Sequence, residues 1–369
     1  MIPVSEPVIG EDEIAKVVDA LRRGEISGTF GKNIDEFERG FAKYCGCRYG
    51  VATTSGTTAL QLAVAAAGIG HGDEVLISSS TNIATALAVV HNGAIPVPVD
   101  SEPETWNLDL GLVAQLITER TRGILPVHLF GHPVDMDRLL DVAHQHKLVV
   151  IEDCAESHGA TCRGRMTGSF GDMGCFSFYA NKVITTGEGG MVISNNEDLA
   201  QKLRLLRNLG FTKPRFRHEV AGFNFRMTGY QAAMGLAQLD KIENIIAEKR
   251  RVAHTYSRFL REIPGICLPA EKEWARNVYW MYAVVVEPGF GLSRDALAAA
   301  LYERGVETRT FFCPMNQQPC LQSRPGFRDI PCPVADRLWE TGLYLPSTYT
   351  LSEKTIRGIC DTIAAVAQP

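Results

Sequence analysis

One lysine, Lys182, lies in the stretch CFSFYANKVITTGEGGMV, between two segments whose apolar residues are typical of buried strands. An ammonium group loses its hydration on burial, so a buried lysine needs a compensating interaction or the loss of its charge. Exposure in a connecting loop is the simpler interpretation of Lys182 taken alone. The alternative is an uncharged lysine bonded to an aldehyde.

Two further features could act with this lysine. Asp153 ends the apolar segment LVVIED, and open α/β sheets bind their ligands beyond the carboxyl ends of the strands. Ser55, Gly56 and Thr57 lie in TTSGTTAL, a small hydroxyl-rich turn that opens a predicted helix. Free amide groups at a helix N-terminus bind phosphate. Capping of a turn or a helix explains each feature equally well on its own.

Taken together, a lysine, a strand-end carboxylate and a phosphate-binding turn are what pyridoxal 5'-phosphate requires. The lysine holds the cofactor aldehyde as a Schiff base, and the carboxylate keeps the pyridine nitrogen protonated. Burial lowers the pKa of such a lysine and keeps it nucleophilic. We therefore predict Lys182 and Asp153 as catalytic residues, with Gly56 and Thr57 binding the cofactor phosphate.

Alternating apolar segments indicate the elements that position these residues. Short strands separated by amphipathic helices are typical of βα units and of a mostly parallel sheet flanked by helices. We expect strands at 74–78, 95–100, 123–128, 148–153, 174–178 and 189–194, with helices at 11–23, 35–44, 58–68, 83–93, 110–117 and 136–146.

The later part of the chain has a different pattern. Residues 199–209 and 229–260 are expected to be largely helical, and a smaller α+β segment follows Pro264. Its expected elements are strands at 281–287 and 306–311 and helices at 294–305 and 353–366. We predict an α/β protein with a large domain over 1–250 and a smaller C-terminal α+β domain over 251–369.

Composition excludes several classes of partner. The formal net charge is -5 and no basic run stands out, so nucleic acid is not expected as a partner. No apolar stretch approaches the length of a membrane span. The ten cysteines are scattered, without CxxC pairs, and no signal peptide is evident. We expect reduced thiols and a cytoplasmic location.

A series of motifs gives the chain a family resemblance. It resembles the DegT/StrS-type sugar aminotransferases, a branch of the fold type I pyridoxal phosphate enzymes, over nearly its whole length. The motifs, in order, are GDEVLI, GAIPVPVD, HLFGHPVDM, IEDCAESHGA, GSFGDMGCFSFYANKVITTGEGGMV, FNFRMTGYQAAMGLAQL and ETRTFFCPM. Within the family, MIPVSEP, CAES and TRTFFCP look closest to the group of GDP-perosamine synthases.

The resemblance implies a role for five residues. Lys182 is the lysine that binds the cofactor and also carries the proton during turnover, and Asp153 is the partner of the pyridine nitrogen. Glu156 lies beside the cofactor ring, and Ser177 adds a hydroxyl to the phosphate site. Asn224 reaches the phosphate of the neighbouring subunit's cofactor, which implies a homodimer with shared active sites.

The resemblance also implies the reaction: L-glutamate donates an amino group to a nucleotide-linked keto-deoxy sugar. The group suggests GDP-4-keto-6-deoxymannose as acceptor and GDP-perosamine, a precursor of surface polysaccharide, as product. Arg226 and Arg309 could bind a diphosphate or a carboxylate, with surface salt bridging as the alternative. Asn316 is a candidate substrate residue near the sugar, at a position where many family members have histidine. Asn82 stands where the family usually has an aromatic residue over the cofactor ring.

Parts of the sequence are also compatible with other functions and sites. A dTDP- or UDP-linked keto sugar or a keto-cyclitol is the alternative acceptor, and a non-catalytic family member is the alternative class. Related sugar 3-dehydratases have histidine in place of the lysine. His128 and His132 could suggest a metal, but no third ligand lies nearby and we expect none. We expect His158 to be structural, and Glu188 has no assigned role.

Overall fold

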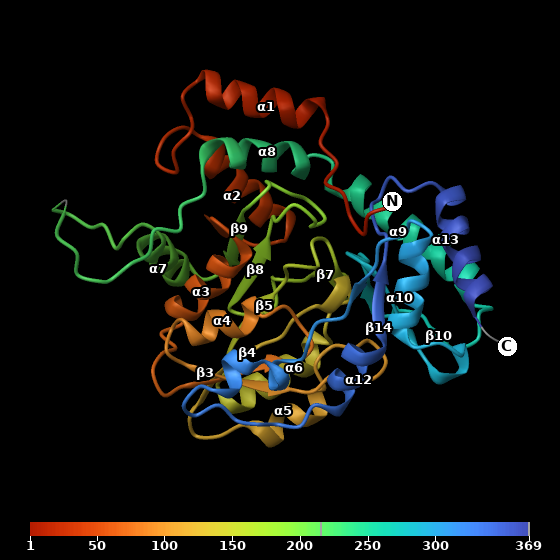
Figure 1. Ribbon diagram of the computed structural model, residues 1–369. Coiled ribbons are helices and arrows are strands. Elements are labelled where there is room, and N and C mark those ends of the chain that lie inside the picture. Colours follow the sequence, from red (N-terminus) through yellow and green to blue (C-terminus); the bar gives the residue numbers. More distant parts are fainter. Residues whose placement is uncertain (215, 368–369) are drawn as a thin grey trace.

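A seven-stranded sheet forms the centre of the molecule in the computed structural model, which describes residues 1–214 and 216–367 (Figure 1). Its strand order is β1-β9-β8-β5-β4-β2-β3. The strands are β1 (Tyr49–Thr53), β9 (Gly190–Ser194), β8 (Met173–Ser177), β5 (Val149–Asp153), β4 (Thr121–Leu125), β2 (Glu74–Ser78) and β3 (Ile95–Val99). Strand β9 runs antiparallel to both neighbours and the other pairs are parallel. The predicted mostly parallel α/β sheet is confirmed.

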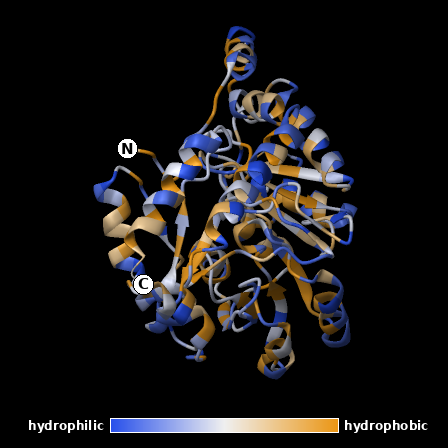
Figure 2. Cartoon of the chain, turned by 90° about the vertical axis from the view of Figure 1, so that its right-hand side faces the viewer, coloured by the Kyte–Doolittle hydropathy of each residue, from blue (hydrophilic) through white to orange (hydrophobic). Residues whose placement is uncertain are grey.

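Helices cover both faces of this sheet, so its strands are buried on two sides. On β8, Phe176 packs with Phe41 of α2, whereas the adjacent Cys175 packs with residues of α3 on the opposite face. Figure 2 shows hydrophobic residues concentrated in the inner strands and hydrophilic residues on the outer helices. The helices of this part are α1 (Glu11–Arg22), α2 (Asn33–Tyr44), α3 (Gly56–Ala66), α4 (Ala84–Val90), α5 (Leu110–Leu116), α6 (Met136–His146), α7 (Glu197–Arg207) and α8 (Gly229–Leu239).

A second, four-stranded sheet lies in the C-terminal part, in the order β10-β12-β14-β13 and with antiparallel pairs throughout. Its strands are β10 (Ile266–Cys267), β12 (Tyr282–Val286), β14 (Gly342–Leu345) and β13 (Arg309–Thr310). A core of its own joins it to α9 (Ile242–Leu260), α10 (Arg294–Glu303) and α13 (Glu353–Val366). The expected domain boundary between residues 250 and 251 stays a prediction. Residues 368–369, at the end of the expected C-terminal domain, lie outside the described residues.

The element boundaries differ from the expected ones in particular places. Within the expected strand over 306–311, only Arg309–Thr310 pairs with β14, and Val306 forms an isolated bridge to Ile2. Strands β1 and β14 and helix α12 (Pro333–Thr341) were not predicted. The remaining short elements are a three-stranded sheet of β11 (Ala275–Arg276), β6 (Thr161–Cys162) and β7 (Arg165–Met166), helix α11 (Pro319–Gln322), and the 3-10 turns η1 (Leu129–Gly131), η2 (Pro288–Phe290) and η3 (Met315–Gln317).

Two segments extend beyond these layers. The N-terminal segment pairs with the C-terminal part: Ile2 bridges Val306, and the Val4 amide donates to Glu307 Oε2 at 3.1 Å. A long excursion between α7 and α8 projects from the body of the molecule (Figure 1), and a bridge between Asn208 and Asn224 lies at its base. Among the described residues, no helix is both long enough and apolar enough to cross a membrane.

Candidate active site

A cavity of about 440 Å³ lies beyond the carboxyl ends of the parallel strands, where an α/β sheet of this kind binds ligands. It brings together most of the predicted site residues, although they come from segments far apart in the chain. Those that line it are Gly56, Thr57, Asp153, Glu156, Ser177, Lys182 and Arg309.

Lys182 follows β8 in a short turn, and its backbone amide donates to the carbonyl of Tyr179 at 2.9 Å. The side chain is half-buried and its Nζ lies 3.7 Å from the centre of the Trp280 ring. Burial lowers the pKa of Lys182, and the negative charges of Glu156 and Asp153 oppose that effect. The lysine is therefore not a solvated loop residue, and no described carboxylate forms an ion pair with it, which is the state needed for a nucleophilic amine.

Asp153 is the last residue of β5, and it is buried with 4% of its surface exposed. Its Oδ2 accepts a hydrogen bond from Thr85 Oγ1 at 2.8 Å, and Oδ1 accepts one from the Ala155 amide at 3.1 Å. Burial raises the pKa of this carboxyl, while these hydrogen bonds and the charge of Lys182 lower it. A cationic nitrogen placed against Asp153 would relieve the cost of its burial.

Glu156 lies three residues further along the chain than Asp153 and is also buried. Its Oε2 accepts the Phe130 amide at 2.7 Å. Burial raises the pKa of Glu156 to about 7, and the positive charge of Lys182 works against this shift. Phe130 has a positive φ of 52°, an uncommon backbone conformation for a residue other than glycine.

The first turn of α3 forms one end of the cavity. Ser55 is its N-cap, and its Oγ accepts the Thr58 amide at 3.1 Å. The amides of Gly56 and Thr57 belong to the turn that has no intrahelical acceptors, so they can bind an anion. A Cβ on Gly56 would lie 2.6 Å from the Cβ of Ser177, so only glycine lets Ser177 approach this helix end.

These residues fit pyridoxal phosphate. The helix terminus with Gly56, Thr57 and Ser177 can hold the phosphate, Asp153 can hold the pyridine nitrogen, and Lys182 can reach the aldehyde carbon. The fit is seen in the close approach of Ser177 to Gly56 and in the buried carboxylate of Asp153, which has two donors but no cationic group bonded to it among the described residues.

Three predicted residues lie elsewhere. Among the described residues that line the cavity, Asn224, Arg226 and Asn316 are absent. Asn224 is exposed at the base of the projecting excursion, and Arg226 donates to Asn208 Oδ1 at 2.9 Å. Asn316 is buried: its Oδ1 accepts Ser79 Oγ at 3.3 Å and its Nδ2 donates to Asp336 Oδ1 at 3.3 Å.

The remaining candidate residues line the cavity or contact other protein groups. Asn82 lines the cavity, and its Oδ1 accepts the Ala84 amide at 3.0 Å at the start of α4. Glu188 also lines it. His158 is enclosed by aromatic rings, and burial lowers its pKa to about 3, which keeps the imidazole neutral. Arg309 lies 3.1 Å from Glu307 Oε1 and is exposed.

The two histidines of HLFGHPVD are engaged by protein groups. Nδ1 of His128 accepts the Val134 amide at 3.0 Å, so its Nε2 carries the proton that faces Glu152 Oε2 at 3.1 Å. Nε2 of His132 accepts the Lys272 amide at 3.2 Å. Cys154 lies close to His128 and Glu152, but this carboxylate also accepts backbone amides, so its oxygens are occupied.

Sequence reasoning missed several residues of this cavity. Thr85, Trp280, Phe312 and Tyr344 contact the predicted residues or line the cavity, and Tyr179 lies at its edge. Thr85 follows Asn82 by about one helical turn, which was a usable signal. Trp280 precedes a strand of the other sheet and has no local sequence signal.

Comparisons with known proteins agree with this geometry. Residues 7–364 match the DegT/DnrJ/EryC1/StrS aminotransferase family. The chain is 43% identical to a GDP-perosamine synthase of Caulobacter vibrioides over 369 residues, which cover 100% of this chain and 98% of that protein. A structure of S. venezuelae DesV in complex with a ketimine intermediate has a TM-score of 0.90 and 36% identity, covering 97% of this chain and 94% of DesV. The sugar aminotransferase Spr1654 of Streptococcus pneumoniae, in its PLP form, has a TM-score of 0.93 and 29% identity, with 99% and 98% covered.

Proposed function

Because the chain belongs to the DegT/DnrJ/EryC1/StrS aminotransferase family, and is a pyridoxal phosphate-dependent nucleotide-sugar aminotransferase, we propose that its acceptor is GDP-4-keto-6-deoxymannose. L-glutamate is the proposed amino donor and GDP-perosamine the product. The observation that carries the substrate is the 43% identity, over the full length of this chain, to a GDP-perosamine synthase. A dTDP- or UDP-linked keto sugar or a keto-cyclitol is the alternative acceptor.

Six residues of the cavity have a defined task in this proposal. Pyridoxal phosphate, when bound, supplies the electron sink for transamination. Lys182 would hold the cofactor at its aldehyde carbon and would move a proton to and from the substrate carbon. Asp153 holds the proton of the pyridine nitrogen by its charge. Gly56, Thr57 and Ser177 hold the phosphate, and Glu156 accepts hydrogen bonds beside the ring.

The acceptor assay tests the substrate directly. The enzyme is first loaded with an amino group from L-glutamate, which removes the visible absorbance of the lysine-bound cofactor. It is then offered GDP-, dTDP- and UDP-linked 4-keto-6-deoxy sugars, a 3-keto sugar and a keto-inositol. We expect the absorbance to return fastest with the GDP sugar. Faster return with the cyclitol would overturn the substrate and leave the aminotransferase chemistry standing.

We also propose a homodimer with shared active sites. Asn224 is exposed and lies outside the cavity of its own chain, so it can serve a cofactor phosphate only in a second chain. Large apolar side chains are exposed on and around α1, which lies beside α8 (Figure 1): Ile14, Leu21, Ile26, Phe30 and Tyr230. Such an exposed apolar patch supports a protein–protein interface at this surface.

We also propose a cytoplasmic location, which the ten free thiols support.

A mixing experiment tests the shared site. Lys182→Ala and Asn224→Ala chains are each expected to have little activity alone. Mixed dimers contain one site in which both residues are intact, so activity should return on mixing after brief dissociation. Full activity in a species that sediments as a monomer would exclude a shared site.

A further inference from the structure

We propose that Trp280 is a positioning residue for Lys182. Its indole ring holds the released amine of this lysine at one place beside the cavity. Sequence and family comparison assign no role to this tryptophan. The inference rests on the proposed role of Lys182 as the cofactor-binding lysine. It concerns the part of each turnover in which that lysine is free and has to carry a proton.

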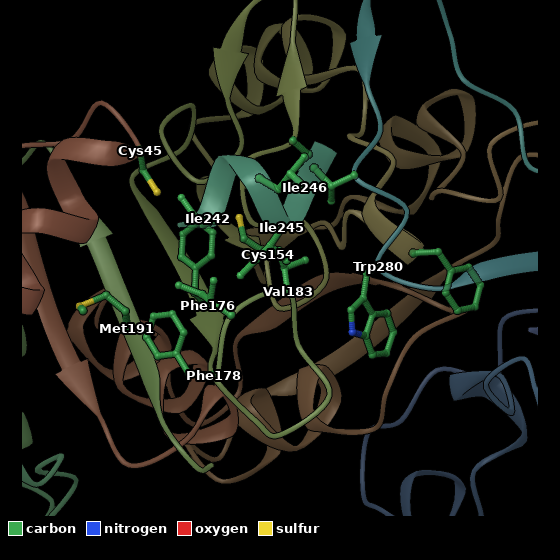
Figure 3. Packing of buried hydrophobic residues seen from close by; sticks show 14 of the residues in the cluster. Cys45, Cys154, Phe176, Phe178, Val183, Met191, Ile242, Ile245, Ile246 and Trp280 are labelled. Atoms are coloured by element: carbon green, nitrogen blue, oxygen red, sulfur yellow. The ribbon is translucent and has the colours of Figure 1, made fainter. Parts of the chain in front are cut away.

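The contact itself is close. Nζ of Lys182 lies 3.7 Å from the centre of the Trp280 ring, well within the distance at which an ammonium is attracted to the face of an indole. The ring is almost fully buried, with 3% of its residue surface exposed, so water competes weakly for the face of the indole. Figure 3 shows Trp280 at one side of the buried cluster that contains Phe176 and Phe178.

Trp280 is held in this orientation from three directions. Its Nε1–H donates to the carbonyl of Asn181, the residue before Lys182, at 2.7 Å. Its own carbonyl accepts Lys249 Nζ at 2.9 Å. Its ring is nearly parallel to that of Phe130, at 6.3 Å between centres and 15° between planes. The indole therefore holds both the backbone beside the lysine and the amine at the end of its side chain.

This arrangement addresses a requirement of the chemistry. A free lysine side chain has many rotamers, and ordering it costs free energy. A fixed aromatic face selects the rotamers that keep the amine in the cavity, and its negative electrostatic potential favours the protonated form against burial. The amine is then available as the acid that returns a proton.

The first experiment measures the amine of Lys182 in cofactor-free enzyme. Pulses of acetic anhydride between about pH 6 and about pH 10 acetylate neutral amines, and mass spectrometry of the Lys182 peptide gives the titration midpoint. The variants are Trp280→Leu, which removes the ring, and Trp280→Phe, which keeps a weaker one. Trp274→Phe, in a separate cavity, is the matched control. All variants keep the titratable and charged groups that face this amine or line its cavity: Asp153, Glu156, His158, Tyr179, Glu188, Arg309 and Tyr344.

Loss of the ring should lower the midpoint, so that Trp280→Leu is acetylated roughly threefold to tenfold faster at a fixed pH on the rising part of the curve. Trp280→Phe should lie between this variant and the unchanged enzyme, and Trp274→Phe should match the unchanged enzyme. A midpoint that stays in place or rises in Trp280→Leu would overturn the inference. Greater access of the reagent changes the plateau rate rather than the midpoint, so simple loosening of the cavity is distinguishable.

The second experiment uses holoenzyme and the L-glutamate half-reaction, followed by the visible absorbance of the lysine-bound cofactor. Trp280→Phe should slow the maximal rate severalfold with little change in the glutamate concentration that gives half of it, because proton transfer and not binding is affected. A change confined to the half-saturating concentration would contradict the proposed role. If the unchanged enzyme gives no reaction with glutamate, the proposed function fails, whereas the titration of cofactor-free enzyme still tests the contact between Trp280 and Lys182.

Discussion

The burial of Lys249 predicts how the free energy of unfolding changes with pH, and by how much. This lysine of α9 is 4% exposed, and its Nζ donates to the carbonyls of Trp280 and Ser347, each at 2.9 Å. No described residue forms an ion pair with it. Burial lowers its pKa from 10.5 to about 7. The change to test is Lys249→Met, which keeps the length and apolar body of the side chain and removes the charge.

The sign follows from proton binding. The folded protein releases the Lys249 proton as the pH rises through about 7, whereas the unfolded chain keeps it until about 10.5. Between these values the unfolded state binds more protons, so the stability of the unchanged protein rises with pH. The full difference is about 5 kcal/mol, and the part gained from about pH 6 to about pH 9 is roughly 2.6 kcal/mol. Below about pH 7 both states are protonated and the charge is buried at full cost.

Urea unfolding of cofactor-free enzyme measures this effect. The free energy of unfolding of the unchanged protein minus that of Lys249→Met should increase by roughly 2.6 kcal/mol over the same pH range. Other titrating groups cancel in this difference, and equal protein concentrations remove any contribution from association. Lys354→Met, an exposed position on α13, is the control and should give no such trend. A flat difference for Lys249→Met would refute the reasoning, since it would mean that the two carbonyls keep the lysine charged when folded.

Three further predictions concern the cavity. Lys182→Ala should abolish turnover and keep the fold, because only a primary amine bonds to the aldehyde and moves the proton; substantial residual transamination in a steady-state assay would exclude the assignment. Asp153→Asn should lower kcat by several orders of magnitude, since a neutral amide cannot hold the pyridine proton by charge, and near-normal rates would leave Asp153 as a cap. Gly56→Ala should weaken cofactor binding at least tenfold in equilibrium dialysis, because the added Cβ would lie 2.6 Å from the Cβ of Ser177, and unchanged affinity would argue against this phosphate site.

The predictable part of the site is the part with a local pattern. Asp153 ends an apolar strand and Gly56 begins a helix, and the general position of ligands in α/β sheets connects the two. Lys182 is found in the same way, because a lone lysine between two buried strands needs a reason. These three residues line one cavity, as the pattern indicates.

The residues that could not be predicted depend on packing between distant segments. Trp280 reaches Lys182 from the other sheet, and no periodicity or turn signal marks that contact. Asn316 was assigned to the sugar pocket by its place in a motif, yet its side chain bonds to Ser79 and Asp336. Short strands such as β14 are equally hard to detect, because four residues of GLYL do not distinguish a strand from the end of the preceding helix.

The docking of the N-terminal segment on the second sheet has a consequence for synthesis on the ribosome. Ile2, Val4 and Glu6 bond to Val306, Glu307 and Thr348, so their partners are translated some three hundred residues later. The large sheet can assemble from residues 49–194 before those partners exist. A nascent chain would therefore carry its first segment undocked through most of translation, and contacts of such long range form slowly. Residues 2–6 are then among the last of the described residues to become ordered.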